Sequence, residues 1–195
     1  PSIPAAAPAL TTIGNFYDLI NLILGDIGAR QGDEALRRAA RVRLSDREIN
    51  RYAKQVLEYL ERLIALDSQL DTAMRSRNFG PAIAAGRTAP QHRLLFRPVG
   101  LTIVMRLIAS LRPDHTLAAA FRLAKKVPLE LTRPPFKGVI WDDRRNRMVT
   151  SNASLTLALL QYMLGERKAD QKLRDRLAVA QGVSTASVRL PARFD

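Results

Sequence analysis

Residues 129–165 read LELTRPPFKGVIWDDRRNRMVTSNASLTLALLQYMLG and contain the clearest sign of β structure in the chain. Short apolar segments lie on both sides of residues 142–147, one ending at Trp141 and the other beginning at Met148. Two apolar segments around a polar turn are typical of a β-hairpin. Because a hairpin this small cannot bury its own apolar face, we expect helices to pack around Trp141, the only tryptophan.

Outside the hairpin the chain shows mainly helical patterns. The clearest helix, 46–66, opens with a capping box, in which Ser45 and Glu48 bind each other's backbone N–H groups. Its apolar residues recur at spacings of three and four, and Tyr59 lies off that stripe. The same kind of spacing predicts further helices at residues 13–24, 98–112, 113–126, 151–164 and 168–180. The predicted fold is mainly α, an irregular helical bundle with one small β-hairpin around residues 138–149.

The remaining segments indicate how the chain is organised. Residues 1–10, rich in Pro and Ala, predict an extended arm or linker, and residues 181–195 predict a loose C-terminal tail. Between them, residues 11–180 are expected to form a single helical domain with the hairpin inserted. A charged connection within it carries a short predicted helix at 34–41. Residues 71–89 lose the helical periodicity and contain Gly and Pro, which predicts a loop that exposes Arg75, Arg77 and Arg87.

The composition argues against several classes of protein. The chain has no Cys, which excludes disulfides and thiolate zinc sites, and only two His, His92 and His115. Motifs for serine hydrolases, P-loop nucleotide binding and dinucleotide binding are absent, so we expect no cofactor, no metal and no catalytic residue in this segment. No apolar run reaches the roughly 18 residues that span a bilayer. We expect a cytoplasmic protein without a membrane partner and, since the chain begins with Pro1, a fragment of a larger protein.

The strongest compositional signal is the formal net charge of +13. Such an excess of positive charge is typical of a polyanion partner, and the simplest is nucleic acid. An alternative remains open, because only six of the 31 cationic residues are Lys and an Arg bias can follow from GC-rich coding. The residues that we predict to contact nucleic-acid phosphates are Arg93, Arg97, Lys125, Lys126, Arg144, Arg145 and Arg147.

Acidic residues offer little for catalysis. Asp142 and Asp143 together could hold Mg²⁺, but adjacent residues on a strand point to opposite faces, which favours a role in the turn. Asp114 followed by the Glu166 segment imitates a nuclease signature, yet Glu166 follows a helix end where that signature requires a strand. If the chain belongs to an enzyme, Asp114, Asp142 and Glu130 are the only acids or bases of interest here.

Four segments together resemble a known family: the opening SIPAAAPALTTIGNFYDLINLIL, then LLFRPVG before a helix, then LTRPPFKGVIWDDRRNRMV, and finally LLQYMLG. In this order they are similar to the C-terminal half of the DGQHR-domain family, which includes the DndB-like DNA sulfur-modification proteins. The Asp-Gly-Gln-His-Arg motif itself is absent, and Gln91-His92-Arg93 follows Ala89-Pro90 instead. The positions that carry the resemblance are Phe96, Arg97, Pro98, Gly100, Trp141, Met148 and Gly165, and of these Arg97 is the one expected to contact a ligand.

The resemblance implies a role in bacterial DNA modification and restriction of the phosphorothioation type, as an accessory or regulatory protein. The leading hypothesis is a non-catalytic, basic helical module that contacts DNA phosphates, partner subunits of the modification system, or both. A second hypothesis is a scaffold for protein interaction or homo-oligomerisation without direct DNA binding, which an exposed apolar patch on helix 46–66 or 151–164 would favour. A third is part of a nucleic-acid-processing enzyme whose catalytic residues lie upstream.

Overall fold

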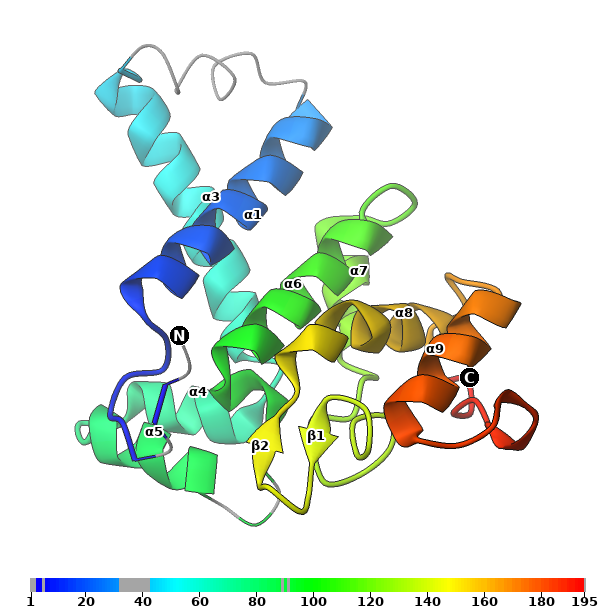
Figure 1. Cartoon of the computed structure of the whole chain (residues 1–195). Coiled ribbons are helices and arrows are strands. Elements are labelled where there is room, and N and C mark those ends of the chain that lie inside the picture. The colour runs from blue at the N-terminus through cyan, green and yellow to red at the C-terminus, as the bar shows by residue number, and fades with distance from the viewer. Residues whose placement is uncertain (1–2, 5, 32–42, 89, 91, 195) are drawn as a thin grey trace.

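The computed structural model describes residues 3–4, 6–31, 43–88, 90 and 92–194. The short helix predicted at 34–41 lies outside these residues. The described helices are α1 (Ile13–Gln31), α3 (Asp46–Ile64), α4 (Ser68–Arg75), α5 (Phe79–Thr88), α6 (Pro98–Leu111), α7 (Leu117–Ala124), α8 (Ala153–Met163) and α9 (Gln171–Gln181), with 3-10 turns η1 (Leu94–Phe96), η2 (Thr150–Asn152) and η3 (Thr185–Ser187). The strands β1 (Trp141–Asp142) and β2 (Arg147–Met148) form an antiparallel pair. The prediction of a mainly helical bundle with one small hairpin is confirmed (Figure 1).

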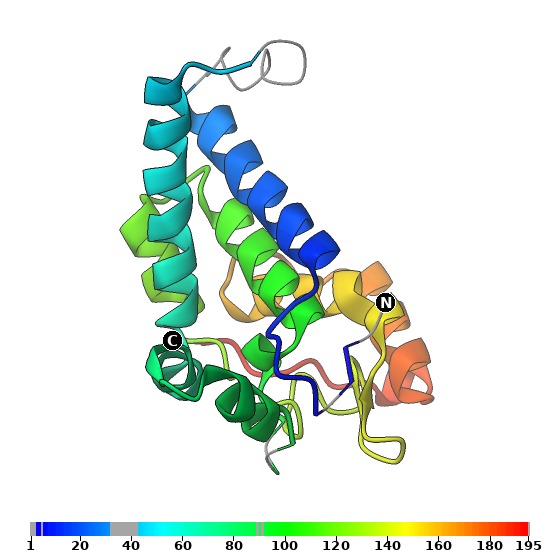
Figure 2. The same ribbon diagram turned by 90° about the vertical axis from the view of Figure 1, so that its left-hand side faces the viewer.

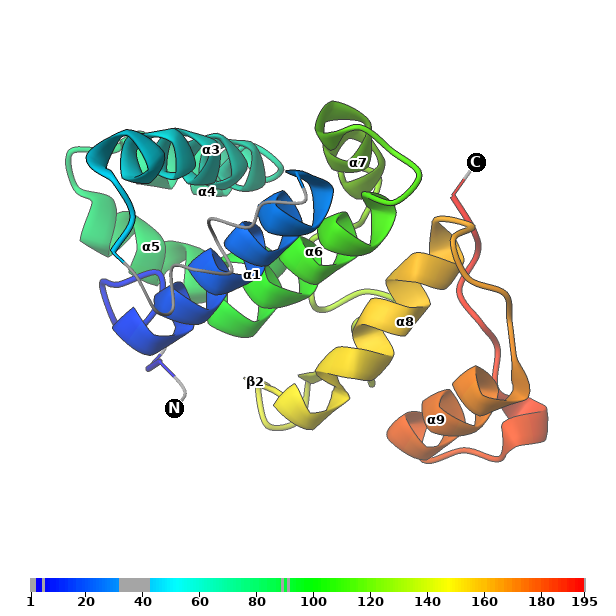
Figure 3. The ribbon, with the colours of Figure 1, turned by 90° about the horizontal axis from the view of Figure 1, so that it is seen from above.

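Helix α6 is the centre of the bundle. It packs against α1, α3, α7 and α8, and Figure 3 shows α1 alongside it. Pro98 occupies its first turn, where the missing N–H has no helical partner to lose. The side chains that α6 buries come from every side of the helix, as expected for a core helix: Leu101, Ile103, Val104, Met105, Leu107, Ile108 and Leu111.

Helix α3 begins as predicted. The Ser45 hydroxyl accepts the N–H of Glu48, and the Glu48 carboxylate accepts the N–H of Ser45 at 2.9 Å. The prediction for Tyr59 was wrong, because this residue is 4% exposed and its hydroxyl donates to the carboxylate of Asp26 at 2.6 Å. Ile49, predicted on the buried stripe, is 44% exposed.

Residues 71–88 lie mostly in helices, where the sequence predicted a loop over 71–89. Most of the segment belongs to α4 and α5, which pack against each other. The Asp67 carboxylate caps α4 by accepting the N–H groups of Gln69 and Leu70. Pro81 is tolerated because it lies in the first turn of α5, where N–H groups have no partner in the helix. Tertiary packing and a cap therefore outweigh the low helix propensity of Gly and Pro.

Helix α1 extends past Gly25, where the sequence predicted its end. It continues to Gln31, and Ile27 in this last part is 4% exposed. A glycine inside a helix costs about 1 kcal/mol, whereas burying an Ile side chain stabilises by roughly 1.5–3 kcal/mol. Burial therefore outweighs the glycine.

The hairpin is anchored in the core by Trp141. Trp141 pairs with Met148 and is 1% exposed, which confirms that the indole is buried among the helices. The ring of His92 lies against it, with the two centroids 4.5 Å apart. Phe136, just before the hairpin, is also fully buried. Figure 2 shows the hairpin at the bottom of the molecule, far from the C-terminal end of α1 and the N-terminal end of α3 at the top.

The C-terminal part packs on α8. A second apolar cluster joins the hairpin segment, α8, α9 and the tail through Val139, Leu155, Leu159, Leu173, Leu177 and Val188. Residues 181–195 were expected to be loose, but within them Val188 is buried and the N–H of Phe194 donates to the carbonyl of Met163 at 2.7 Å. These contacts hold the described tail at two points. Within the described residues, none of the helices has both the length and the apolar character needed to cross a bilayer.

Two glycines give a matched test of the packing at α6. A Cβ atom at Gly100 would lie 1.9 Å from the carbonyl oxygen of Leu94, whereas one at Gly25 would meet nothing within 4 Å. Gly100→Ala should lower the free energy of unfolding by about 3 kcal/mol, since backbone must move. Gly25→Ala should raise it by about 0.5–1 kcal/mol through helix propensity. Urea unfolding measures both changes, and two changes of the same sign would contradict this packing.

Candidate nucleic-acid interface

The turn of the hairpin is built on Asp142. Its carboxylate accepts the backbone N–H groups of Arg144 at 3.1 Å and Arg145 at 3.2 Å, and Asn146 adopts a φ of 49°. The N–H of Arg145 is the main cause that holds the pKa of Asp142 below its ordinary value. An Asp that bonds to the backbone two residues later is a recognised turn former. Asp142 therefore serves the turn, as the sequence analysis favoured over a metal site.

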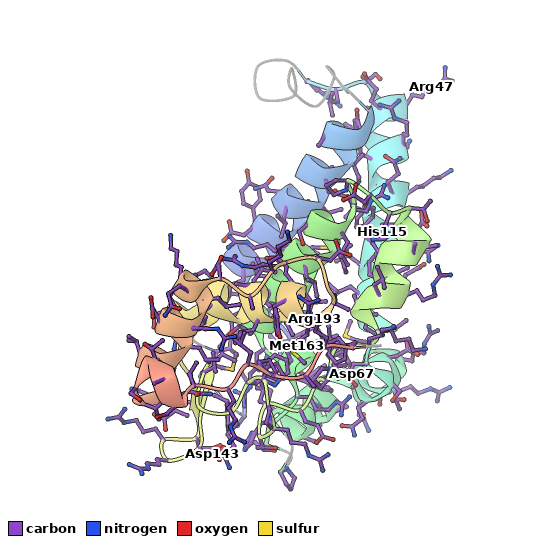
Figure 4. All side chains as sticks on the ribbon, turned by 90° about the vertical axis from the view of Figure 1, so that its right-hand side faces the viewer. Arg47, Asp67, His115, Asp143, Met163 and Arg193 are labelled. Carbon is purple, nitrogen blue, oxygen red and sulfur yellow. The ribbon has the colours of Figure 1, made fainter. Side chains whose placement is uncertain are left out.

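Around this turn, cationic side chains project into solvent. Arg144, Arg145 and Arg147 are all exposed. Arg145 contacts the Asp142 carboxylate at 3.4 Å, while Arg144 and Arg147 form no ion pair with any described residue. Lys137, which the sequence analysis missed, pairs with Asp143 at 2.5 Å. Figure 4 shows Asp143 at the tip of the hairpin, at the opposite end of the molecule from Arg47.

A pocket of about 520 Å³ opens between the hairpin and the C-terminal end of α9. Its apolar walls include Val139, Val149 and Ala180. Its charged and amide groups come from Lys137, Asp142, Asp143, Arg144, Arg145, Asn152 and Gln181. The Nδ2 of Asn152 donates to the carbonyl of Val139 at 2.8 Å, which holds η2 against the hairpin.

Arg93 and Arg97, two of the residues predicted to contact phosphate, flank η1 and are not part of the hairpin. Arg93 Nε donates to the fully buried carboxylate of Asp67 at 2.7 Å. Arg97 donates to the carbonyl of Arg87 at 2.9 Å, its Cζ lies 5.7 Å from the Trp141 ring centre, and burial lowers its pKa. The Nε of Arg97 is buried without a hydrogen-bond partner among the described residues. The guanidinium of Arg93 is therefore engaged by Asp67, and that of Arg97 lies over Trp141.

Lys125 and Lys126 lie neither on the hairpin nor beside Arg93 and Arg97 in the chain, but at the C-terminal end of α7. They follow α7, which packs beside α6 and apart from β1 and β2 in both views (Figures 1 and 2). Both side chains are exposed. Of the seven predicted phosphate contacts, the structure thus brings together Arg144, Arg145 and Arg147, and it separates the other four from them.

Arg87 was predicted to be exposed and is instead 1% exposed. Its guanidinium donates to the carbonyl oxygens of Phe96, Ala7, Ala9 and Leu10, and so ties the N-terminal arm to α5 and η1. Burial, and then the charge of Arg97, lower its pKa. A signal in the sequence existed, because Arg87 lies four residues after Ile83, on the buried face of α5.

The remaining acids of interest have ordinary surroundings. Glu130 pairs with Arg133 at 2.8 Å, and Asp114 is exposed after the end of α6. The Glu166 carboxylate lies 3.4 Å from the His115 ring. Across the described ranges, no group of three His, Asp or Glu side chains is arranged to hold a metal ion.

Tyr59, Asp26 and Arg112 form a buried polar cluster. The Nε of Arg112 lies 3.3 Å from the carboxylate oxygen that accepts the Tyr59 hydroxyl. The pKa of Tyr59 is raised from 10.0 to about 12, mainly by burial and secondly by the hydrogen bond to Asp26.

This raised pKa predicts a loss of stability in alkali. The unfolded chain ionises Tyr59 near pH 10 and the folded chain near pH 12. The stability that Tyr59 contributes to the folded state is therefore complete below pH 10 and is lost as the pH rises to 12. Urea unfolding at a series of pH values gives the free energy of unfolding as a function of pH. Tyr59→Phe should reduce its decline between pH 10 and pH 12. Tyr17→Phe, at a residue that is 65% exposed, should leave it unchanged, and equal curves for both variants would contradict the assignment.

Comparisons with known proteins give no match to a family model, to a curated protein or to a solved structure. The resemblance to the DGQHR-domain family therefore stays a prediction.

Proposed function

We propose that this chain is a non-catalytic nucleic-acid-contacting module, and that the hairpin turn is the part that touches the phosphates. The observation that carries the proposal is the placement of Arg144 and Arg147, which are exposed on the same hairpin and free of ion pairs with the described residues. A guanidinium without a carboxylate partner is available for a phosphate oxygen. The net charge of +13 adds a long-range attraction to any polyanion.

The rigidity of the turn supports this role. Asp142 fixes the backbone of the turn, and Trp141 anchors β1 in the core. Side chains presented on a preorganised backbone lose less conformational entropy on binding than those on a mobile loop. A protruding turn of this kind suits contact with a DNA groove or backbone.

We further propose, from the sequence resemblance, that the DNA belongs to a modification system of the phosphorothioation type, with this chain as an accessory or regulatory part. The positions that carry the resemblance have structural reasons to be what they are. Phe96 packs where Gly86 leaves room, Gly100 admits the Leu94 carbonyl, and Trp141 holds the hairpin. The positions that carry the resemblance thus include residues at which the hairpin segment, η1, α5 and α6 pack closely.

Duplex DNA binding measured against salt tests the proposal. Fluorescence anisotropy with a labelled 20-bp duplex, from 50 to 500 mM salt, should give a log–log slope of about −3 or steeper, because each contacted phosphate contributes about −0.9. A flat response, or no binding at the lowest salt, would contradict direct contact with DNA.

A second candidate function is a scaffold for protein interaction or homo-oligomerisation. Exposed apolar side chains favour it, namely Leu57 on α3 together with Ile13 and Tyr17 on α1. An apolar cavity of about 600 Å³, lined by Phe16, Leu63 and neighbours, opens beside α1. Sedimentation velocity over a range of protein concentrations tests self-association, which a monomer throughout would contradict.

A further inference from the structure

We infer that the pocket beside the hairpin receives a single unpaired nucleotide, so that the chain prefers nucleic acid with an extruded or single-stranded base over a perfect duplex. The inference rests on the proposed function and deepens it. The hairpin arginines alone would recognise any phosphate backbone. The pocket adds a hollow that a stacked, paired base cannot enter.

The size and walls of the pocket fit a base. Its volume of about 520 Å³ lies within the range of small-ligand sites. Val149 and Ala180, both half-buried, provide an apolar surface against which the flat face of a base can lie. Enzymes and binding proteins that read unpaired bases place them in such hollows, where hydrogen bonds reach the edge of the base.

Amide groups at the rim supply those hydrogen bonds. Asn152 uses its Nδ2 on the Val139 carbonyl, so its Oδ1 remains to accept from a base. Gln181, the last residue of α9, is exposed at the opposite wall and offers both a donor and an acceptor. A side-chain amide matches the paired donor and acceptor of a base edge.

The charge of the pocket fits one phosphate. Three cations lie around it, Lys137, Arg144 and Arg145, against two carboxylates, those of Asp142 and Asp143, which leaves a formal charge of +1. Lys137 and Arg145 are occupied by these carboxylates, and Arg144 is not. One nucleotide within a strand carries one phosphodiester charge. The pocket is thus balanced for a single nucleotide rather than for a run of phosphates.

The test compares two labelled 20-bp duplexes that differ by one unpaired 2-aminopurine in the centre. By anisotropy, the bulged duplex should bind about tenfold more tightly, since a side-chain amide that pairs with both groups of a base edge gives a discrimination of about this size. The 2-aminopurine fluorescence should change on binding. A free deoxynucleoside monophosphate should compete weakly when it is added at the concentration at which unlabelled bulged duplex displaces the labelled one, because it lacks the backbone that the hairpin contacts. Strong competition would assign the pocket to free nucleotides and overturn the inference.

Two adjacent residues of α9 give matched variants. Ala180→Trp fills the pocket, and Val179→Trp adds the same ring at a site that is 82% exposed and outside the pocket. The preference for the bulge should fall to about onefold in the first variant and stay near tenfold in the second. Gln181→Trp, at the exposed rim, replaces Ala180→Trp if circular dichroism shows that the latter is unfolded.

The outcomes separate the two proposals. Duplex binding that depends on the hairpin arginines, with no preference for the bulge, would overturn this inference and leave the proposed function standing. A preference that survives both pocket-filling variants would also overturn it. Absence of binding to either duplex would contradict both the inference and the proposed function.

Discussion

Replacing Arg144, Arg145 and Arg147 together by Gln should weaken duplex DNA binding by about 100-fold at 0.15 M salt. Three lost phosphate contacts remove about 2.7 from the magnitude of the salt slope, and at this salt concentration each contact contributes close to fivefold in affinity. The fold should survive, because all three side chains are exposed and the turn is held by Asp142 and Trp141, which are retained. Anisotropy at several salt concentrations measures both the affinity and the slope.

The control removes the same charge from other surfaces. Arg47, Arg106 and Arg122 are exposed, form no ion pair with the described residues, and lie on α3, α6 and α7. Their combined change to Gln lowers the net charge equally, so it should weaken binding only through the long-range field, by about threefold or less. Equal losses in the two triple variants would mean that total charge, and not the hairpin, determines DNA binding.

Arg87→Met should lower the free energy of unfolding by about 3–5 kcal/mol. The guanidinium donates to the carbonyls of Phe96, Ala7, Ala9 and Leu10, and a hydrogen bond to a charged group contributes about 1.5–3 kcal/mol. The buried carbonyl of Phe96 would lose this partner, and the N-terminal arm would lose its attachment to α5. Urea unfolding gives the loss of stability, and hydrogen exchange of residues 6–12 reports the release of the arm.

Arg75→Met is the matched control. Arg75, on α4, is exposed, and its one ion pair with a described residue is with Asp71 one turn earlier. Such a surface pair contributes about 0.3–0.5 kcal/mol, so the variant should stay within about 0.5 kcal/mol of the wild type. A loss below 1 kcal/mol for Arg87→Met would show that the carbonyl contacts do not stabilise the arm.

The sequence predicts the elements whose signals are local. The capping box at Ser45 and Glu48 places the start of α3, and Pro98 places the start of α6. The apolar segments around residues 142–147 locate the hairpin, and the burial of Trp141 follows from the small size of a two-stranded unit. Each of these inferences depends on residues within a few positions of one another.

The direction of the arginines could not be predicted in the same way. All arginines have the same side-chain chemistry, but their partners differ. The guanidinium of Arg87 bonds to Ala7, 80 residues away, that of Arg93 to Asp67, 26 residues away, and that of Arg97 to the carbonyl of Arg87, ten residues away. The guanidinium of Arg144 has no partner among the described residues. Counting charge therefore finds the basic character of the chain but not its basic face. That face emerges only when tertiary contacts, such as Asp67 beneath Arg93, show which guanidinium groups are already engaged.

The most direct test of the account is to observe the hairpin while DNA binds. In a titration of the isotope-labelled 21.7-kDa chain with a 20-bp duplex, NMR should follow the backbone amides and the arginine Nε–H groups. The largest shift changes are expected within residues 142–147, with the Nε–H signals of Arg144 and Arg147 moving together with their backbone amides. Changes concentrated on α1 and α3, with residues 142–147 unaffected at saturating DNA, would contradict it.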